Sequence, residues 1–549
     1  MKYTENFIKL YEKAFREFYE LPALSDYGTD VTFTYKELAI EVEKIHFLFS
    51  EHGIQKGEKI ALVGKNSAYW GAVFLAAITH GAVIVPILNE FNSKDIQNIV
   101  NHSDAVLLFA SDYILADLDE SKMPALKASY SFTGKNISNK SEGENLSVRL
   151  TELFNKKYPA GFSPELINYT AHPNENLMVL NYTSGTTGFS KGVLLTGDNL
   201  TGNIIYAQIT LPLDKGDTLL SLLPMAHAYG CAFEFLFPLT MGVHVTFLGK
   251  TPSPKVLMKA FADVKPNLII SVPLILEKIY KNMIIPTVNK PIIKILLKIP
   301  GINSLLYSTI RKKLAGAFGG RFEQVVIGGA PLNKEVEEFF IKIKFPVAVG
   351  YGMTECAPLI SYSLSQYYVP LSCGKILPNM EVRIDSSDPY NKEGEIQVRG
   401  QNMMLGYYKN EEATKQVFTD DGWLKTGDLG TLDKDNNVFI RGRSKSLILG
   451  PSGQNIYPEE LEAKLNNLPY IVESLVVSKN NRIIALVYPD YDAAKAAGLS
   501  PDDLKKVMVE NKRLLNNMVS TFEKIGDIQL VEQEFEKTPK RSIKRFMYT

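Results

Sequence analysis

Residues 59–110 read KIALVGKNSAYWGAVFLAAITHGAVIVPILNEFNSKDIQNIVNHSDAVLLFA, and this stretch decides the fold class. Apolar runs that predict strands alternate in it with helical patterns, in the order strand 59–64, helix 67–80, strand 82–88, helix 93–104 and strand 105–110. Such alternation is typical of a parallel sheet that is covered by helices on both faces.

One part of this stretch, residues 68–88, contains no Asp, Glu, Lys or Arg and is nearly long enough to cross a bilayer. His80, Gly81 and Pro86 interrupt it. We therefore interpret it as a helix that stops at Gly81 and a strand that follows, both inside a globular core.

The alternation continues through most of the chain. Helical segments such as 253–264 and 333–343 separate further runs that predict strands, at 177–183, 217–224, 243–249, 267–273, 324–329 and 346–352. From about residue 372 to 442, short alternating segments between Gly- and Asp-rich turns predict a small antiparallel β unit. The remaining residues predict a compact α+β module. The fold class that follows is α/β, with parallel-rich sheets flanked by helices.

Composition excludes several classes of protein. The 549 residues include 60 basic and 60 acidic side chains, so the net charge is zero and predicts no nucleic-acid partner. Cys231, Cys356 and Cys373 are scattered and lack CxxC spacing, which argues against a disulfide scaffold and suits a reducing compartment. The N-terminus lacks the apolar core of a signal peptide, so we predict a cytoplasmic protein.

Residues 278–322 depart from this neutral average. They contain nine basic side chains and no acidic one, with apolar residues between them. A basic amphipathic stretch can lie on an anionic membrane surface or attract an anionic ligand. A solvated helix face over the core is the alternative, and both interpretations stay open here.

The richest chemical motif is YTSGTTGFSKG, residues 182–192, which follows a strand-like run. Its glycines allow backbone N–H groups to approach a polyphosphate, its hydroxyls donate hydrogen bonds, and its lysine supplies positive charge. The spacing is not that of a Walker A loop, because two residues separate Gly188 from Lys191 and Gly192 follows the lysine. A flexible surface loop is the alternative, but the density of hydroxyls favours phosphate binding by Thr183, Ser184, Gly185, Thr186, Thr187 and Lys191.

This loop resembles the phosphate loop of the adenylate-forming (AMP-binding) superfamily, which includes acyl-CoA synthetases, amino-acid adenylation domains and luciferases. Other segments resemble the family's motifs in the same order, namely LLPMAHAYG (222–230), GGA (328–330), YGMTE (351–355), TGD (426–428) and RGRSK (441–445). One short string can arise by chance, but the shared order makes chance a poor explanation. The resemblance implies an N-terminal AMP-binding domain, 1–442, with the β unit at about 372–442, joined by a hinge to a small mobile C-terminal domain, 443–549.

The resemblance also implies nucleotide-binding roles. Gly328, Gly329 and Ala330 are expected to pack on adenine. Tyr351, with Gly352 beside it, offers a flat face to the purine. Asp428 can accept hydrogen bonds from the ribose hydroxyls, and Arg443 adds donors nearby.

The remaining roles concern catalysis and the acyl group. Glu355 is a hard carboxylate beside Thr354, so we expect it to hold Mg²⁺ on the ATP phosphates, with both residues counted as catalytic. His227 and Gly352 are expected to line the acyl site, and Lys445 to lie at the hinge. Alone, His227 would more often be a packing histidine, so we give it a binding role only.

The C-terminal tail departs from the family pattern. The family's catalytic lysine usually lies immediately before an Ile or Val, where this chain has Ser542. In an extended segment, residues two apart point the same way, so Lys540 or Lys544 could reach the same space. We predict that Lys540 takes the catalytic role.

The resemblance implies ATP-dependent activation of a carboxylic acid through acyl-AMP, with MgATP and coenzyme A as cosubstrates. The basic 278–322 segment and the KRF ending resemble long-chain fatty acyl-CoA synthetases, so we expect a medium- or long-chain fatty acid and a peripheral membrane contact through 278–322. Two alternatives remain. One is a fatty acyl-AMP ligase that loads a carrier protein, and the other, which Ser542 suggests, is a non-catalytic acyl- or nucleotide-binding relative.

Overall fold

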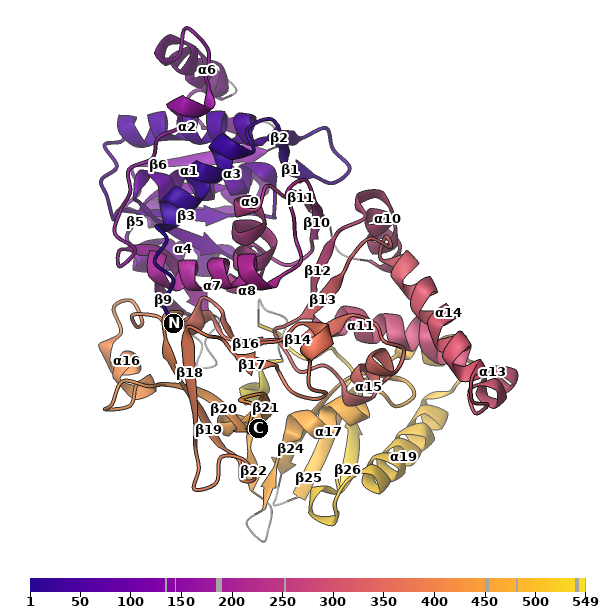
Figure 1. Cartoon of the computed structure of the whole chain (residues 1–549). Coiled ribbons are helices and arrows are strands. Elements are labelled where there is room, and N and C mark those ends of the chain that lie inside the picture. The colour runs from indigo at the N-terminus through magenta and orange to yellow at the C-terminus, as the bar shows by residue number, and fades with distance from the viewer. Residues whose placement is uncertain are drawn as a thin grey trace.

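Two seven-stranded, helix-flanked sheets form the scaffold of the computed structural model (Figure 1), which describes residues 1–133, 136–143, 145–183, 190–250, 253–449, 454–479, 482–538 and 543–548. The first sheet has the order β7-β6-β5-β3-β4-β8-β9. Its inner pairs are parallel, whereas β7 and β9 pair antiparallel at the two edges. Its strands are β3 (Lys59–Val63), β4 (Val83–Ile87), β5 (Ala105–Ala110), β6 (Ala128–Thr133), β7 (Asn136–Ser138), β8 (Leu177–Thr183) and β9 (Lys191–Thr196).

The second sheet has the order β14-β13-β12-β10-β11-β1-β2. All of its pairs are parallel except that of β1 with β2. Its strands are β1 (Pro22–Asp26), β2 (Thr32–Thr34), β10 (Thr218–Ser221), β11 (His244–Phe247), β12 (Leu268–Ser271), β13 (Gln324–Ile327) and β14 (Val347–Val349). The predicted α/β class is confirmed, with the addition that β1 and β2 bring the start of the chain beside β11.

Local signals explain where the helices lie. The Ser67 hydroxyl caps α3 (Ala68–His80) by accepting a hydrogen bond from the Trp70 N–H, and Gly81 ends the helix at φ 90°, where a side chain would be strained. Residues 68–79 are all buried, so the uncharged stretch is core, as predicted. The other helices before the β unit are α1 (Phe7–Glu17), α2 (Tyr35–Glu51), α4 (Ser93–Ser103), α5 (Asp112–Asp117), α6 (Asn145–Lys157), α7 (Gly197–Thr210), α8 (Ala228–Gly230), α9 (Phe237–Thr240), α10 (Pro254–Val264), α11 (Pro273–Ile279), α12 (Ile285–Val288), α13 (Pro291–Leu296), α14 (Ile302–Ala317) and α15 (Lys334–Lys342).

The predicted antiparallel β unit is confirmed as the four-stranded sheet β18-β19-β20-β21. A separate three-stranded sheet, β15-β16-β17, lies in chain order between β14 of the second large sheet and β18. These elements are β15 (Tyr351–Gly352), β16 (Leu359–Tyr362), β17 (Lys375–Ile376), β18 (Met380–Asp385), β19 (Gly394–Gly400), α16 (Glu411–Val417), β20 (Leu424–Leu432) and β21 (Val438–Arg443). The sequence pattern does not single out β20, because the TGD motif interrupts its apolar alternation.

The buried apolar residues form one large cluster within residues 3–438 and two smaller clusters within 456–535. The smaller clusters belong to the α+β module, whose elements are β22 (Ile448–Leu449), β23 (Asn455–Ile456), α17 (Pro458–Leu465), β24 (Ile471–Lys479), β25 (Arg482–Pro489), α18 (Tyr491–Ala496), α19 (Pro501–Met518) and β26 (Asp527–Leu530). The boundary at 442/443 stays a prediction. In the part of the chain that the structure describes, no helix is both long enough and apolar enough to cross a membrane.

Candidate active site

The YGMTE motif and the small antiparallel sheet meet at a buried carboxylate. The Tyr351 hydroxyl, on β15, donates to Asp428 Oδ2 at 2.7 Å, and Arg443 Nε lies 3.0 Å from Asp428 Oδ1. Asp428 and Arg443 face each other across β20 and β21. Burial raises the pKa of the Asp428 carboxyl, which is 5% exposed, while the Arg443 guanidinium opposes that shift.

This arrangement brings together three of the predicted nucleotide-binding residues. Asp428 is held from two sides, and the Arg443 side chain, 66% exposed, extends from it into solvent. The Tyr351 ring is buried at 6% exposure, and its hydroxyl is committed to Asp428. Its proposed stacking on the purine stays a prediction.

A second cluster surrounds Glu355. The Tyr407 hydroxyl donates to Glu355 Oε1 at 2.9 Å, and Lys191 Nζ lies 4.7 Å from the centroid of the Tyr407 ring. Tyr407 is 8% exposed, whereas Glu355 is half-buried. Burial and the neighbouring Glu355 charge raise the pKa of the Tyr407 hydroxyl, so it remains a donor at neutral pH. Tyr407 thus links the predicted phosphate-binding lysine to the predicted magnesium ligand.

The ends of the predicted phosphate loop are fixed by strand pairing. Thr183, the last residue of β8, pairs with Lys191, the first residue of β9. Ser184, Gly185, Thr186 and Thr187 lie outside the described residues. Of the predicted phosphate-binding residues, Thr183 and Lys191 are therefore the two with a described position.

Beside this hairpin, a third cluster of polar side chains contacts Tyr182 at the end of β8. His102 Nδ1 and the Tyr182 hydroxyl are 2.7 Å apart, and the Tyr408 hydroxyl donates to Asp104 Oδ2 at 2.6 Å. Lys409 Nζ lies 2.7 Å from Asp104 Oδ1. Tyr182 precedes Thr183, and Tyr408 follows Tyr407. The C-terminal end of α4 therefore contacts residues adjacent to the phosphate loop and to the Glu355 cluster.

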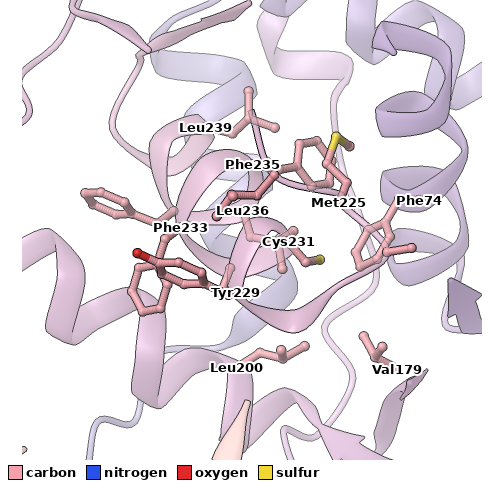
Figure 2. Close-up of a cluster of buried hydrophobic side chains, with 14 of the residues drawn as sticks. Phe74, Val179, Leu200, Met225, Tyr229, Cys231, Phe233, Phe235, Leu236 and Leu239 are labelled. Carbon is pink, nitrogen blue, oxygen red and sulfur yellow. The ribbon is translucent and has the colours of Figure 1, made fainter. Parts of the chain in front are cut away.

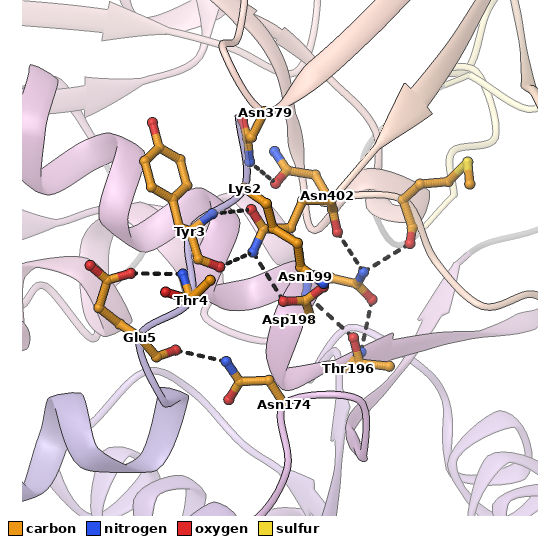
Figure 3. Close-up of polar contacts among 12 residues, drawn as sticks. Lys2, Tyr3, Thr4, Glu5, Asn174, Thr196, Asp198, Asn199, Asn379 and Asn402 are labelled. Atoms are coloured by element: carbon orange, nitrogen blue, oxygen red, sulfur yellow. Dashed lines mark hydrogen bonds and ion pairs between the residues drawn. The ribbon is translucent and has the colours of Figure 1, made fainter.

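The segment 401–408, which carries Tyr407, is held at its start by a polar network (Figure 3). The Asn199 side-chain amide, on α7, donates to the carbonyls of Gln401 and Met403, both at 2.8 Å. The Gln401 side chain exchanges two hydrogen bonds with the Tyr3 backbone, at 2.9 and 2.7 Å. Further along, the Leu194 N–H of β9 donates to the Gly406 carbonyl at 3.0 Å. The position of Tyr407 is therefore determined by contacts with distant parts of the chain.

The glycines of two motifs lie where a side chain would clash. A Cβ on Gly328, at the end of β13, would lie 2.9 Å from the Tyr229 ring, and one on Gly352 would lie 2.2 Å from the Pro358 carbonyl oxygen. Gly329 has φ 87° and, like Ala330, is exposed. Both turns therefore depend on glycine at these positions.

Thr354 is 6% exposed and opens a short 3₁₀ turn, Thr354–Cys356, that also carries Glu355. The structure thus buries the hydroxyl and leaves the carboxylate half-exposed.

The predicted acyl segment packs on a helix of unusual geometry. His227 Nδ1 accepts a hydrogen bond from the Tyr229 N–H and so caps α8, which continues into a π-helix, Cys231–Leu236. Figure 2 shows the apolar side chains around this helix. Inside them lies Glu234, fully buried, which accepts hydrogen bonds from the Leu223 N–H at 2.8 Å and the Ser221 hydroxyl at 2.9 Å.

Burial raises the pKa of the Glu234 carboxyl to about 8. Glu234 was not predicted to have a role, although a single acidic residue in the apolar run GCAFEFLFPL is a signal that the sequence carries. Glu234 therefore holds the start of the 222–230 segment, which carries His227.

The predicted C-terminal residues are only partly described. Lys445 is exposed in the short turn Ser444–Ser446, and Lys544 pairs with Glu536 at 3.2 Å. Lys540 and Ser542 lie outside the described residues. A Cβ on Gly442 would lie 2.7 Å from the Tyr457 ring, so the β unit and the start of α17 are in close contact there.

Among the described residues, no group of three His, Cys, Asp or Glu side chains is arranged to hold a metal ion. Mg²⁺ in nucleotide sites needs only one or two carboxylates, because phosphates and water complete the octahedron. Glu355 fits that requirement, since it is half-exposed and Tyr407 occupies only its Oε1.

Comparison with known proteins establishes the family. A family model described as AMP-binding enzyme matches residues 11–408, so the chain belongs to that family. It is 30% identical to "Long-chain-fatty-acid--CoA ligase FadD15" of Mycobacterium bovis, over 94% of this chain and 90% of the relative. It is also 27% identical to "4-coumarate--CoA ligase" of Pinus taeda, over 96% of this chain and 91% of the relative.

Solved structures show the same fold. The anthranilate CoA ligase AuaEII in complex with anthranoyl-AMP aligns with a TM-score of 0.78 at 18% identity, covering all of this chain and 97% of that one. ATP-bound MatB from Rhodopseudomonas palustris aligns with a TM-score of 0.76 at 22% identity, covering 99% of this chain and 98% of that one.

Proposed function

We propose that the protein activates a medium- or long-chain fatty acid with ATP and transfers the acyl group to coenzyme A. The main observation in support is that three motifs far apart in the sequence lie close together in the structure. Tyr351 and Asp428 touch, and Glu355, four residues after Tyr351, is linked through Tyr407 to Lys191. Relatives named as fatty-acid–CoA ligases support the substrate class.

In the first step, a carboxylate oxygen attacks the α-phosphorus of ATP and pyrophosphate leaves, giving acyl-AMP. In the second step, the CoA sulfur attacks the acyl carbonyl, its proton passes to solvent, and AMP leaves. The first step brings two anions together, so positive charge has to be focused on the phosphates in a site closed to water. Lys191 would supply charge at the phosphate loop, and Asp428 with Arg443 would hold the ribose.

Mg²⁺, when bound, would neutralise charge on the ATP phosphates. Glu355 is the residue that we expect to hold it, with Thr354 beside it. Tyr407 would fix Glu355 through its Oε1, so that the carboxylate is held in one position for this role.

We further propose that Lys540 supplies the catalytic positive charge. In the family a lysine supplies it from the position that Ser542 occupies in this chain. Lys544 already pairs with Glu536, which favours Lys540. Losing one such donor costs on the order of 100- to 1000-fold in rate. Lys540→Ala should therefore suppress acyl-AMP formation far more than Lys544→Ala, whereas equal small effects would contradict the assignment.

A thioester assay with ATP and CoA tests the proposed function. The acids should run from acetate to oleate and include 4-coumarate, because relatives named as 4-coumarate–CoA ligases also match. We expect the highest kcat/KM with acids of medium or long chain. A preference for 4-coumarate would overturn the substrate class, and transfer to a carrier protein instead of CoA would overturn the acceptor. No pyrophosphate release with any acid would favour a non-catalytic protein.

The three cysteines are free and buried, which suits a reducing compartment, and we propose a cytoplasmic location.

A further inference from the structure

The end of the chain folds back onto the C-terminal module, and an arginine holds it there. The Arg545 guanidinium donates to both carboxylate oxygens of Glu462, on α17, at 2.8 and 2.7 Å. It also donates to the Val476 carbonyl, on β24, at 2.9 Å, while the Val476 N–H donates to Glu462 at 2.6 Å. Figure 1 marks the C-terminus beside α17 and β24, the two elements that Arg545 joins.

These contacts cover the edge of the module's sheet. Among the strands that the structure describes, β24 is the outer one in the order β24-β25-β26. Glu462 and Arg545 give the Val476 N–H and carbonyl the partners that a further strand would supply. The two side chains are 12% and 21% exposed, and burial raises the pKa of the Glu462 carboxyl while the Arg545 charge opposes that shift. Arg545 therefore compensates a buried carboxylate.

Arg545 also lies next to a point where the chain returns on itself. Lys537 and Ile543 form an antiparallel bridge, which brings the two ends of the intervening segment together. Lys540 lies midway between these two residues in sequence. Residues 539–542 lie outside the described residues, whereas both ends of the segment are described.

The two ends of this segment are attached by different contacts. At the first end, Lys537 Nζ lies 2.9 Å from a carboxylate oxygen of Glu473, on β24. Beyond the second end, the Tyr548 ring packs edge-on against Phe535, with 5.2 Å between the ring centroids. The second end reaches α17 and β24 through Arg545.

We propose that Arg545 is a positioning residue for acyl-AMP formation, because it fixes the second end of the segment that carries Lys540. This inference rests on the proposed function, in which Lys540 supplies positive charge in the first step. A lysine on a segment with one loose end would meet the α-phosphate in a smaller fraction of its conformations. A displacement of about 1 Å can cost about 100-fold in rate.

The two half-reactions separate a positioning role from a structural one. ATP–pyrophosphate exchange with dodecanoate reports the first step, and thioester formation from added dodecanoyl-AMP and CoA reports the second. Arg545→Met should slow exchange by about tenfold to 100-fold and change thioester formation less than about twofold. Arg545→Lys keeps the charge but loses the fork of donors, so it should slow exchange less than Arg545→Met.

A double variant distinguishes positioning from stability. Arg545→Met alone leaves the Glu462 charge buried and uncompensated, which destabilises the module. Arg545→Met, Glu462→Met removes both charges and should restore the melting temperature. Exchange should stay slow in this double variant, because neither methionine ties the tail to β24. Recovery of exchange together with the melting temperature would show that the arginine is only structural and would overturn the inference.

A second combination tests whether Arg545 acts through Lys540. Adding Arg545→Met to Lys540→Ala should slow exchange no further than Lys540→Ala alone, because both changes remove the same contribution. A clear further loss would overturn the inference. Equal slowing of the two half-reactions by Arg545→Met would overturn it as well.

Arg149→Met is the matched control. Arg149, on α6, likewise donates twice to one glutamate, from Nε and Nη2 to Glu142 at 2.7 and 3.1 Å, and Figure 1 places α6 at the other end of the molecule. This variant should leave both half-reactions within about twofold of the unchanged protein, and an effect equal to that of Arg545→Met would contradict the inference. If the unchanged protein shows no exchange with any acid, the proposed function itself fails, and the inference fails with it.

Discussion

Replacing Tyr407 by phenylalanine removes one hydroxyl and tests whether that residue positions Glu355. The hydrogen bond from Tyr407 to Glu355 Oε1 is 2.9 Å long. A hydrogen bond to a charged group contributes about 1.5–3 kcal/mol, which corresponds to roughly 10- to 150-fold. Because Glu355 is half-exposed, water can replace the hydroxyl, and we expect the lower limit, about tenfold.

The assay is ATP–pyrophosphate exchange with a fixed fatty acid, titrated with Mg²⁺. Tyr407→Phe should raise the Mg²⁺ concentration needed for half-maximal exchange about tenfold. Calorimetric titration gives a second readout that needs no turnover. The affinity for ATP with Mg²⁺ should fall by a similar factor, while the affinity for ATP without Mg²⁺ changes less than threefold.

Tyr69→Phe is the matched control. Tyr69 is 4% exposed, and its hydroxyl donates to Glu41 Oε2 at 3.1 Å, so the change breaks a similar buried pair between α2 and α3. It should lower the melting temperature about as much as Tyr407→Phe and leave the Mg²⁺ titration unchanged. The positioning role is refuted if Tyr407→Phe leaves that titration unchanged, or if both variants shift it equally.

Three further changes test other contacts. Glu234 has a pKa raised to about 8, so its contribution to stability is complete below its ordinary pKa and is lost as pH rises through about 8. Melting at pH 5–8 should therefore show the unchanged protein losing stability relative to Glu234→Gln, by at most about 1.4 kcal/mol per pH unit. Gly442→Ala should displace Tyr457 and speed proteolysis after Arg443. Adding Tyr457→Ala should reverse this effect, because it removes the ring that the new side chain meets. Equal proteolysis of the single and double variants would show that the contact is unimportant. Asp428→Asn should weaken AMP binding at least tenfold in calorimetry, whereas unchanged affinity would remove Asp428 from the nucleotide site.

The sequence predicts the scaffold well because its buried parallel strands are continuous apolar runs. β4 and the stop at Gly81 follow from local composition alone. β1 was not predicted, since Pro22–Asp26 is short and carries Pro and Asp, and its partner β11 lies far along the chain. Pairing of that kind depends on tertiary contacts.

In the candidate site too, residues within local motifs were predicted, whereas residues whose role depends on tertiary contacts were not. Asp428, Arg443 and Tyr351 were predicted together because each lies in a motif. Tyr407 and Glu234 were not, because their roles arise from contacts with residues distant in sequence. No spacing rule reveals that a tyrosine 52 residues after Glu355 donates to it.

The contacts around Arg443 bear on how the two parts of the chain can move. Asp428 is buried and held by Tyr351, and the Ser444 hydroxyl donates to the Gly427 carbonyl at 3.1 Å. The chain is thus tied to β20 up to Ser444, and the next residue, Lys445, is exposed. A rotation at Lys445 would carry the C-terminal module while leaving the Asp428–Arg443 pair in place. Under the proposed function, the ribose would stay bound to Asp428 while the surface that closes the site is exchanged, as a reaction with two successive nucleophiles requires.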